Sequence, residues 1–226
     1  MCSARQLPNV DDSAVDLLVL GQWRTPPAAQ SAALDGSSAA WDDVEMPPGM
    51  LSHTAFAAEE PDLVVHVSLA TNLNAYKTFD KHRWATVVDQ HVAGIQRISA
   101  TPYRRYRSVH TDQPGSPGCV VMVHFEAESA HTAREWIDNL ITASTPATAP
   151  PGMLSAHFHI ATDGTRILNY AEWTDTHSHQ QSVADRSKPE NQPVIAVVDT
   201  AAAVKHLHYQ RFTDWHTTTP AQTPNH

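Results

Sequence analysis

Side chains in the second half of the sequence could form a reactive pocket. Asn169, Ala171 and Trp173 alternate along an expected strand, so all three should project from one face of it. Ala171 leaves room between an amide that can hydrogen-bond an oxygen anion and an indole that can form a flat apolar wall. His179 follows six residues later, and histidine commonly titrates near neutral pH and transfers protons. If the substrate is a phenol, a pocket of this kind could remove its proton and hold its ring.

Each of these residues also has a structural alternative. A tryptophan at the end of a strand commonly packs in the core, and an inward-facing amide commonly satisfies backbone groups. A histidine on a helix is commonly exposed to solvent. The sequence leaves both interpretations open.

Fifteen histidines form a surplus that other sites could use. We name as candidate substrate-binding residues His53, His66, Tyr76, His157 and His159. His157 and His159 alternate on one face of an expected strand, and His206 and His208 repeat that spacing. Paired imidazoles could bind a metal, but no carboxylate or cysteine stands at a matching spacing. No metal site is therefore predicted.

A local basic set stands out in this acidic chain: Arg83, Arg104, Arg105 and Arg107. It could hold a flavin phosphate or a substrate carboxylate, and a solvated strand face is the alternative. The chain lacks a G-x-G-x-x-G turn, although a flavin that diffuses in as a reduced co-substrate would leave no such motif. No cofactor-binding residue is assigned.

An internal repeat organises the chain. Residues Pro47–Ser52 recur unchanged as Pro150–Ser155, at an offset of 103 residues. At the same offset Val64–Thr71 falls on Ile167–Thr174. Such a register predicts one small domain written twice, with two copies that have diverged at polar positions.

Each copy shows the order strand, helix, hairpin, helix, strand. In the first copy we expect strands over 15–23, 50–57, 62–71 and 103–110, and helices over 26–46 and 72–95. In the second copy we expect strands over 119–126, 153–161 and 166–173, helices over 130–144 and from 174 or 175, and extended segments over 194–198 and 205–213. Asp163-Gly164 is a strong hairpin signal.

This order is that of a ferredoxin-like unit. We therefore predict an α+β protein of two tandem ferredoxin-like domains with antiparallel sheets, which cover each other as an intrachain pseudo-dimer. The expected organisation is a flexible N-terminus (1–14), a first domain (15–112), a linker (113–118), a second domain (119–216) and a disordered tail (217–226).

Composition narrows the class of protein. Apolar residues make up 41% of the chain and charged residues 17%, as in ordinary soluble proteins. No stretch has the roughly 18 apolar residues of a membrane span, and no signal pattern opens the chain, so we expect a cytoplasmic protein. The net charge of −9 argues against nucleic acid as a partner. Two cysteines far apart exclude a disulfide framework.

The second hairpin carries a family resemblance. The segments that carry the resemblance are Pro151-Gly152-Met153-Leu154, Asp163-Gly164-Thr165-Arg166 and Asn169-Tyr170-Ala171-Glu172-Trp173. They resemble the antibiotic biosynthesis monooxygenase family, whose members are dimeric α+β-barrel proteins. Members oxidise anthrones to quinones without a cofactor. Tandem-domain members act on polycyclic, angucycline-type polyketide intermediates with reduced flavin, and related members degrade haem.

The resemblance also implies a site. Cofactor-free members have Asn, then Trp four residues on, then Tyr six residues further. Asn169 and Trp173 match this pattern, and His179 stands in the place of the tyrosine. The first copy has His66, Ala70 and Tyr76 at these positions. Either the second copy holds the active pocket with histidine in place of tyrosine, or each copy keeps a different specialised pocket.

The function that the resemblance implies is an oxygenase of aromatic polyketide tailoring in antibiotic biosynthesis. Asn169, Trp173 and His179 are the expected catalytic residues, acting by deprotonation of a phenol and reaction with O2. Either no cofactor is required or reduced flavin (FMNH2 or FADH2) is a diffusible co-substrate. A flavin reductase and a second copy of the chain are the expected protein partners. The alternatives are a haem-binding or haem-degrading protein, a non-oxidative cyclase or isomerase, and a silent binding subunit.

Overall fold

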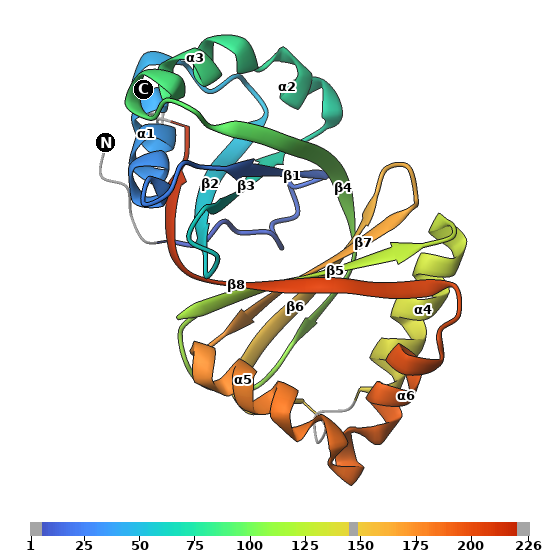
Figure 1. Ribbon diagram of the computed structural model, residues 1–226. Helices are drawn as coiled ribbons and strands as arrows, with labels where there is room; N and C mark the ends of the chain where they lie inside the picture. Colours follow the sequence, from blue (N-terminus) through green and yellow to red (C-terminus); the bar gives the residue numbers. More distant parts are fainter. Residues whose placement is uncertain (1–5, 145–148, 221–226) are drawn as a thin grey trace. The chain divides into compact units, whose positions relative to one another are not determined.

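The computed structural model describes residues 6–144 and 149–220. Its described residues form eight β-strands and six α-helices (Figure 1). The chain divides into two compact units. The first unit comprises residues 1–102 and 214–226, and the second unit comprises residues 103–213.

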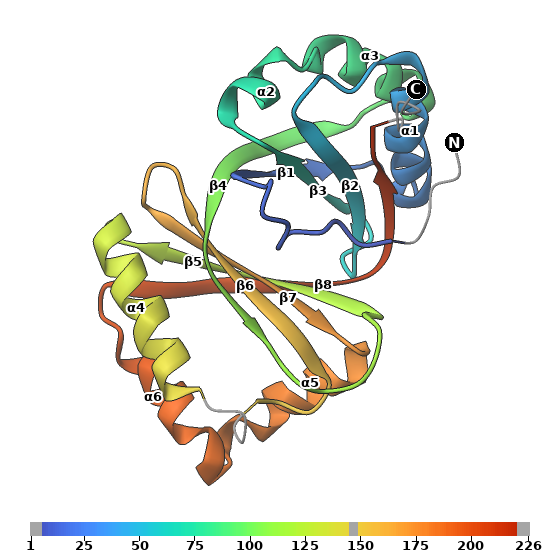
Figure 2. The same ribbon diagram turned by 180° about the vertical axis from the view of Figure 1, so that it is seen from behind.

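The first unit is an antiparallel sheet with helices on one face (Figures 1 and 2). Its elements are β1 (Leu17–Arg24), α1 (Gln30–Asp43), β2 (Met50–Ala58), β3 (Leu63–Ala70), α2 (Leu73–Thr78), α3 (Lys81–His91) and the start of β4 (Gln96–His110). The strand order is β4-β1-β3-β2, as expected for a ferredoxin-like unit. Helices α1 and α3 supply Leu34, Trp41, Trp84 and Val88 to the core over this sheet.

The second unit repeats the arrangement. Its elements are β5 (Cys119–Ala127), α4 (Ala130–Ala143), β6 (Met153–Ala161), β7 (Arg166–Trp173), α5 (Thr176–Ala184), two 3-10 turns (Asp185–Ser187 and Pro189–Asn191), α6 (Gln192–Thr200) and β8 (Val204–Thr218). The strand order is β8-β5-β7-β6. The α+β class, the antiparallel sheets and the ferredoxin-like order are thus confirmed, and the pseudo-dimer stays a prediction.

The repeated Pro-Pro-Gly segment makes the same turn in both units. Gly49 and Gly152 have φ of +87° and +83°, the left-handed region that favours glycine. The backbone N–H of Thr71 donates to Gly49 O over 2.8 Å, and that of Thr174 donates to Gly152 O over the same distance. The sequence identity of the two segments therefore reflects one backbone requirement, met twice.

Two expected helix boundaries differ from the structure. Helix α1 covers Gln30–Asp43 rather than 26–46. Gly36 lies within it and allows α1 and α3 to approach, because a Cβ there would lie 2.7 Å from the Cβ of His91. The expected helix over 72–95 is two helices. They are separated at Phe79, and the side chain of Asp80 caps α3 by accepting from the N–H of Arg83 over 3.0 Å.

The expected extended segment over 194–198 is part of helix α6. Val194, Val197 and Val198 pack against the core of the second unit, with the i, i+3, i+4 spacing of a helix face. Pro193 lies in the first turn of the helix, where its missing N–H costs nothing. A short apolar run does not by itself separate a strand from a helix.

The two units match the domain boundaries expected from the sequence only in part. Strands β4 and β8 each start in one unit and end in the other, and residues 103–110 of β4 pair with β6. The expected linker (113–118) therefore lies within the second unit rather than between the units. Of the expected loose ends, residues 1–5 and 221–226 lie outside the described residues, whereas Val10 is buried and Thr217 belongs to β8.

Among the described residues, none of the helices combines the length and the apolar character needed to cross a bilayer.

Candidate functional site

A pocket of about 270 Å³ opens in the first unit. Residues of β1, β2, β3, β4, α2 and α3 line it, among them Trp23, His53, His66, Tyr76, Lys81 and Trp84. The candidate substrate-binding residues His53, His66 and Tyr76 are therefore brought together here. Their placement at one pocket agrees with the sequence expectation for the first copy, and their role stays a prediction.

A hydrogen-bonded pair of histidines forms the polar part of this pocket. His53 Nε2 and His66 Nδ1 lie 3.1 Å apart, and His53 Nδ1 lies 2.9 Å from Ser68 Oγ. Strand β3 places His66 and Ser68 on one face, and the register of β2 sets His53 opposite Ser68. Ser37 of α1 adds a contact of 3.3 Å from its Oγ to His53 Nε2. The pair is thus held from two strands and a helix.

Burial keeps both imidazoles uncharged. It lowers the pKa of His53 to about 3, and burial, with the charges of His53 and Arg97, lowers the pKa of His66 well below its usual value. At neutral pH each ring therefore carries a single proton and has one nitrogen that can accept another. No deprotonation is needed before either ring can act as a base.

The hydrogen-bond chain has two tautomeric arrangements. If Ser68 donates to His53 Nδ1, then His53 Nε2 donates to His66 Nδ1 and leaves a proton on His66 Nε2. If His66 Nδ1 donates to His53, then His66 Nε2 is a bare acceptor. His66 Nε2 is buried and has no hydrogen-bond partner among the described residues. It is the open end of the chain in either case, and His66 lines the pocket.

Aromatic rings surround this open end. The ring of Trp23 lies 3.8 Å from that of His66 between centroids, and the ring of Trp84 lies perpendicular to His66 at 5.9 Å. Trp84 Nε1 is also buried without a partner in the part of the chain that the structure describes. A flat, apolar molecule with polar substituents matches such a lining.

In the second unit two of the three expected catalytic residues, Trp173 and His179, are in contact. The rings of Trp173 and His179 lie 4.9 Å apart at 79°, and Asn169 shares its face of β7 with Trp173. Asn169 Oδ1 and Trp173 Nε1 are buried and lack hydrogen-bond partners among the described residues. Trp173 and Ala171 also belong to the apolar core of this unit. The reactive and the structural interpretations of Trp173 therefore both find support.

His179 differs from the neutral-pH base that its spacing indicated. Arg211 Nε donates to His179 Nδ1 over 2.8 Å, which leaves the proton of the neutral ring on Nε2. Burial and then the charge of Arg211 lower the pKa of His179 to about 4. His179 is therefore placed to donate a hydrogen bond from Nε2 at neutral pH.

His157 and His159 lie on the face of β6 that points away from the helices. The alternating residues Ala156, Phe158 and Ile160 occupy the core under the helices instead. The two histidines therefore share a face of the strand, as expected, but do not face the same side of the sheet as Asn169 and Trp173.

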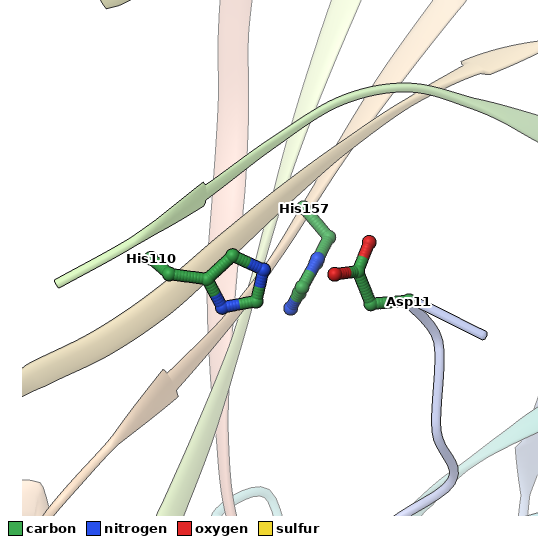
Figure 3. A group of neighbouring side chains, drawn as sticks. All are labelled: Asp11, His110 and His157. Atoms are coloured by element: carbon green, nitrogen blue, oxygen red, sulfur yellow. The ribbon is translucent and has the colours of Figure 1, made fainter. Parts of the chain in front are cut away.

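Both ring nitrogens of His157 have hydrogen-bond contacts, whereas His159 Nε2 is buried without a partner among the described residues. His157 Nδ1 and Nε2 lie 2.9 Å and 3.0 Å from the hydroxyls of Ser108 and Ser155. The rings of His157 and His110 lie 5.4 Å apart between centroids (Figure 3). His159 Nδ1 is 3.0 Å from His157 O, and burial lowers the pKa of His159 to about 3.

Two of the four arginines have structural partners within their own units. Arg107 pairs with Asp138 at 3.0 Å, and Arg83 donates to the backbone oxygen of Asp43 over 2.9 Å. For these two residues the solvated, structural alternative fits the contacts.

The sequence did not single out several residues of the two sites. These residues are Trp23, Ser68, Lys81, Arg97 and Arg211. Ser68 follows His66 at the two-residue spacing of a strand face, which is a signal that could have been used. Arg211 reaches His179 from β8, 32 residues away in the sequence, and no local pattern announces that contact.

Comparison with known proteins identifies the fold. No protein-family model matches the chain, and no match was found among curated proteins. An anthrone oxidase-like protein shares the fold with a TM-score of 0.73 and 15% identity, over 93% of this chain and 97% of that one. A candidate monooxygenase of Fusobacterium nucleatum gives a TM-score of 0.59 at 12% identity, over 93% and 98% of the two chains. One of Lactobacillus acidophilus gives 0.55 at 12%, over 92% and 97%. The chain thus has the fold of monooxygenase-like proteins.

Proposed function

We propose that this protein is an oxygenase that acts on a polycyclic phenolic molecule of the aromatic polyketide type, in antibiotic biosynthesis. The observation that carries the proposal is the open nitrogen of a buried, uncharged histidine pair, set in an aromatic pocket of the first unit. The fold shared with the anthrone oxidase-like protein agrees with it.

Proton removal from the substrate is the first proposed step. His66 Nε2 accepts the phenolic proton, and His66 Nδ1–H passes a proton to His53 Nε2 along the 3.1 Å hydrogen bond. The positive charge then lies on His53, whose Nδ1–H donates to Ser68 Oγ. The new phenolate lies close by and raises the proton affinity of the pair, which offsets the effect of burial.

Oxygen chemistry follows from the electron-rich anion. The anion passes an electron to O2, and a carbon–oxygen bond forms to give a peroxide. Loss of water breaks the O–O bond, so that a CH2 group becomes a carbonyl, one oxygen atom stays in the product and the other leaves as water. This balance needs no further reductant. A hydroxylation or a ring opening that needs two more electrons would take them from reduced flavin as a diffusible co-substrate.

The second unit supplies a second proposed site. Asn169, Trp173 and His179 offer an acceptor, an indole N–H and a neutral imidazole donor, the last held by Arg211. These groups suit an oxygen-bearing aromatic ligand. We therefore propose that each unit keeps its own specialised pocket, and that proton removal belongs to the first.

Oxygen uptake by metal-stripped protein tests this function. We would measure uptake with anthrone and with a polycyclic phenol, each with and without an FMN or FAD reducing system. His66→Gln should lower kcat by about 100-fold, because general-base catalysis contributes on that order. The matched control is His82→Gln on the exposed side of α3, which should leave kcat unchanged.

Each arm of this experiment separates one alternative. Uptake without flavin supports the cofactor-free reaction, and uptake only with reduced flavin supports the flavin-dependent one. A Soret shift on addition of haemin would favour a haem protein, and product formed under argon would favour a cyclase or isomerase. No uptake in any arm, or a wild-type rate for His66→Gln, would reject the proposed role of the first pocket.

A further inference from the structure

The first-unit pocket is cationic although the protein is acidic. The chain has a net charge of −9, yet the residues that line this pocket include Lys81 and Arg97 and no aspartate or glutamate. The two histidines in it are uncharged at neutral pH because they are buried. A positive potential inside an acidic protein favours anions at this point of the surface.

Arg97 already has a carboxylate partner, whereas Lys81 has none among the described residues. Arg97 pairs with Asp89 at 2.8 Å and donates to the backbone oxygen of Ala85 over 3.2 Å. The ammonium of Lys81 instead lies over the ring of Tyr76, 4.1 Å from its centroid, and has no carboxylate partner among the described residues. Lys81 is therefore the charge that is left for a ligand.

The surroundings of Lys81 make this charge costly without an anion. Partial burial and the neighbouring charge of Lys77 lower the pKa of Lys81. Lys81 begins helix α3, where the carboxylate of Asp80, which caps the helix, offsets the positive end of the helix dipole. An anionic group at the pocket would offset the cost of burial and the repulsion from Lys77.

The residues that line the pocket differ in their exposure to solvent. Lys81 is exposed, whereas His66 is only 4% exposed and its Nε2 lacks a partner in the described part of the chain. The rings of Trp23 and Trp84 lie beside His66, 5.4 Å from each other between centroids. A ligand that satisfies every group has a flat ring system, a hydroxyl for the buried imidazole and an anionic substituent for the ammonium.

We propose that the first-unit pocket binds a planar aromatic acid, whose ionised carboxylate pairs with Lys81 while its hydroxyl reaches His66. This inference rests on the proposed function and names the substrate class of the same pocket. It makes Lys81 a specificity-determining residue, because a neutral analogue of the same shape would leave the ammonium unpaired.

Calorimetric binding of two matched ligands tests the proposal. We would titrate 6-hydroxy-2-naphthoate and its methyl ester into the full-length protein under argon at pH 7.5, where only the acid is charged. The acid should bind about fivefold more tightly than the ester at low salt, and the difference should shrink as salt screens the charge. Lys81→Gln should abolish the preference by weakening the acid alone.

Two further variants serve as controls for charge. Lys81→Arg keeps the charge and should keep the preference for the acid. Lys77→Gln removes a neighbouring charge that does not line the pocket, and it should change the affinity for the acid by less than about twofold. Equal affinities for acid and ester, an equal loss of both in Lys81→Gln, or no binding of either ligand would overturn the proposal.

The binding measurement is independent of turnover. Acid binding at Lys81 in a protein that consumes no O2 would reject the oxygenase and leave this inference standing. Oxygen uptake with equal affinity for the acid and the ester would support the oxygenase and reject the acid-binding site.

Discussion

Arg211 Nε donates to His179 Nδ1 over 2.8 Å, so a permanent cation touches a histidine that stays neutral. The arginine has two effects on the ring. It fixes the tautomer with the proton on Nε2, and its charge adds to burial in lowering the pKa of His179 to about 4. Arg211 is thus a positioning residue for the site proposed in the second unit.

Replacing Arg211 should release His179. In Arg211→Met we expect the pKa of His179 to rise from about 4 toward 6.5, although burial should hold it below that value. Two-dimensional NMR of the imidazole nitrogens across a pH series would report both the pKa and the loss of the single tautomer. Arg134→Gln, on α4, should leave the titration unchanged. An unaltered titration in Arg211→Met would contradict the role assigned to this contact.

Buried histidines should also make the protein sensitive to acid. His53 and His159 have a pKa of about 3 in the folded protein, against 6.5 when unfolded, so only the unfolded chain takes up their protons below pH 6.5. The stabilisation is therefore complete above pH 6.5 and is lost as the pH falls toward 3. Each such histidine should lower the free energy of unfolding by up to about 1.4 kcal/mol per pH unit.

Urea denaturation at intervals between pH 7 and pH 4.5 measures this slope. His53→Gln removes one titrating group and should flatten the curve. The control is Val64→Ala, which lowers stability without removing a titrating group and should keep the slope of the wild type. A pH-independent free energy of unfolding over this range would contradict the low pKa of the buried rings in the folded protein.

Turnover of variants in the second unit distinguishes one working pocket from two. If Asn169, Trp173 and His179 are catalytic, Trp173→Ala and His179→Ala should each lower kcat by at least about tenfold. Trp173→Phe keeps the apolar wall and separates loss of the indole N–H from loss of packing. Wild-type kcat in both alanine variants, with the fold intact by circular dichroism, would remove this site from the reaction.

Gly152 should be intolerant of any side chain. Its φ is +83°, and a Cβ would lie 2.5 Å from the Cβ of Ser178 and 2.7 Å from Thr174 Oγ1. Gly152→Ala should therefore lower the free energy of unfolding by about 1–3 kcal/mol. Gly21→Ala is the control, because its Cβ would meet nothing closer than 3.6 Å. Thermal denaturation of the two variants side by side gives the comparison.

Local signals account for the part of the fold that the sequence predicted. Asp163-Gly164 defined a hairpin whose strands, Met153–Ala161 and Arg166–Trp173, have the expected bounds. Ser129 directly precedes the expected helix over 130–144, and its side chain caps that helix by accepting from the N–H of Thr132 over 3.2 Å. In both cases a few neighbouring residues determine the backbone, so a single sequence contains the necessary information.

The pairing register of strands β2 and β3 explains why the contact between His53 and His66 could not be predicted. His53 meets His66 only because β2 has a shift in pairing between Met50 and Ser52. A slip of one residue would turn His53 to the other face of the sheet. The sequence could therefore name His53 and His66 as candidates but could not place their nitrogens 3.1 Å apart. The contact of Arg211 with His179 depends in the same way on the pairing of β8, which no local pattern encodes.

Strands β4 and β8 determine where the chain can be cut into separate pieces. Residues 103–110 precede the expected linker but belong to the second unit, and residues 214–218 return to the first. A cut of the chain at the expected linker (113–118) would therefore leave residues 103–110 with the first piece, although they belong to the second unit. The second unit is one continuous segment, residues 103–213, so cuts at residues 102 and 213 would divide the chain without splitting that unit.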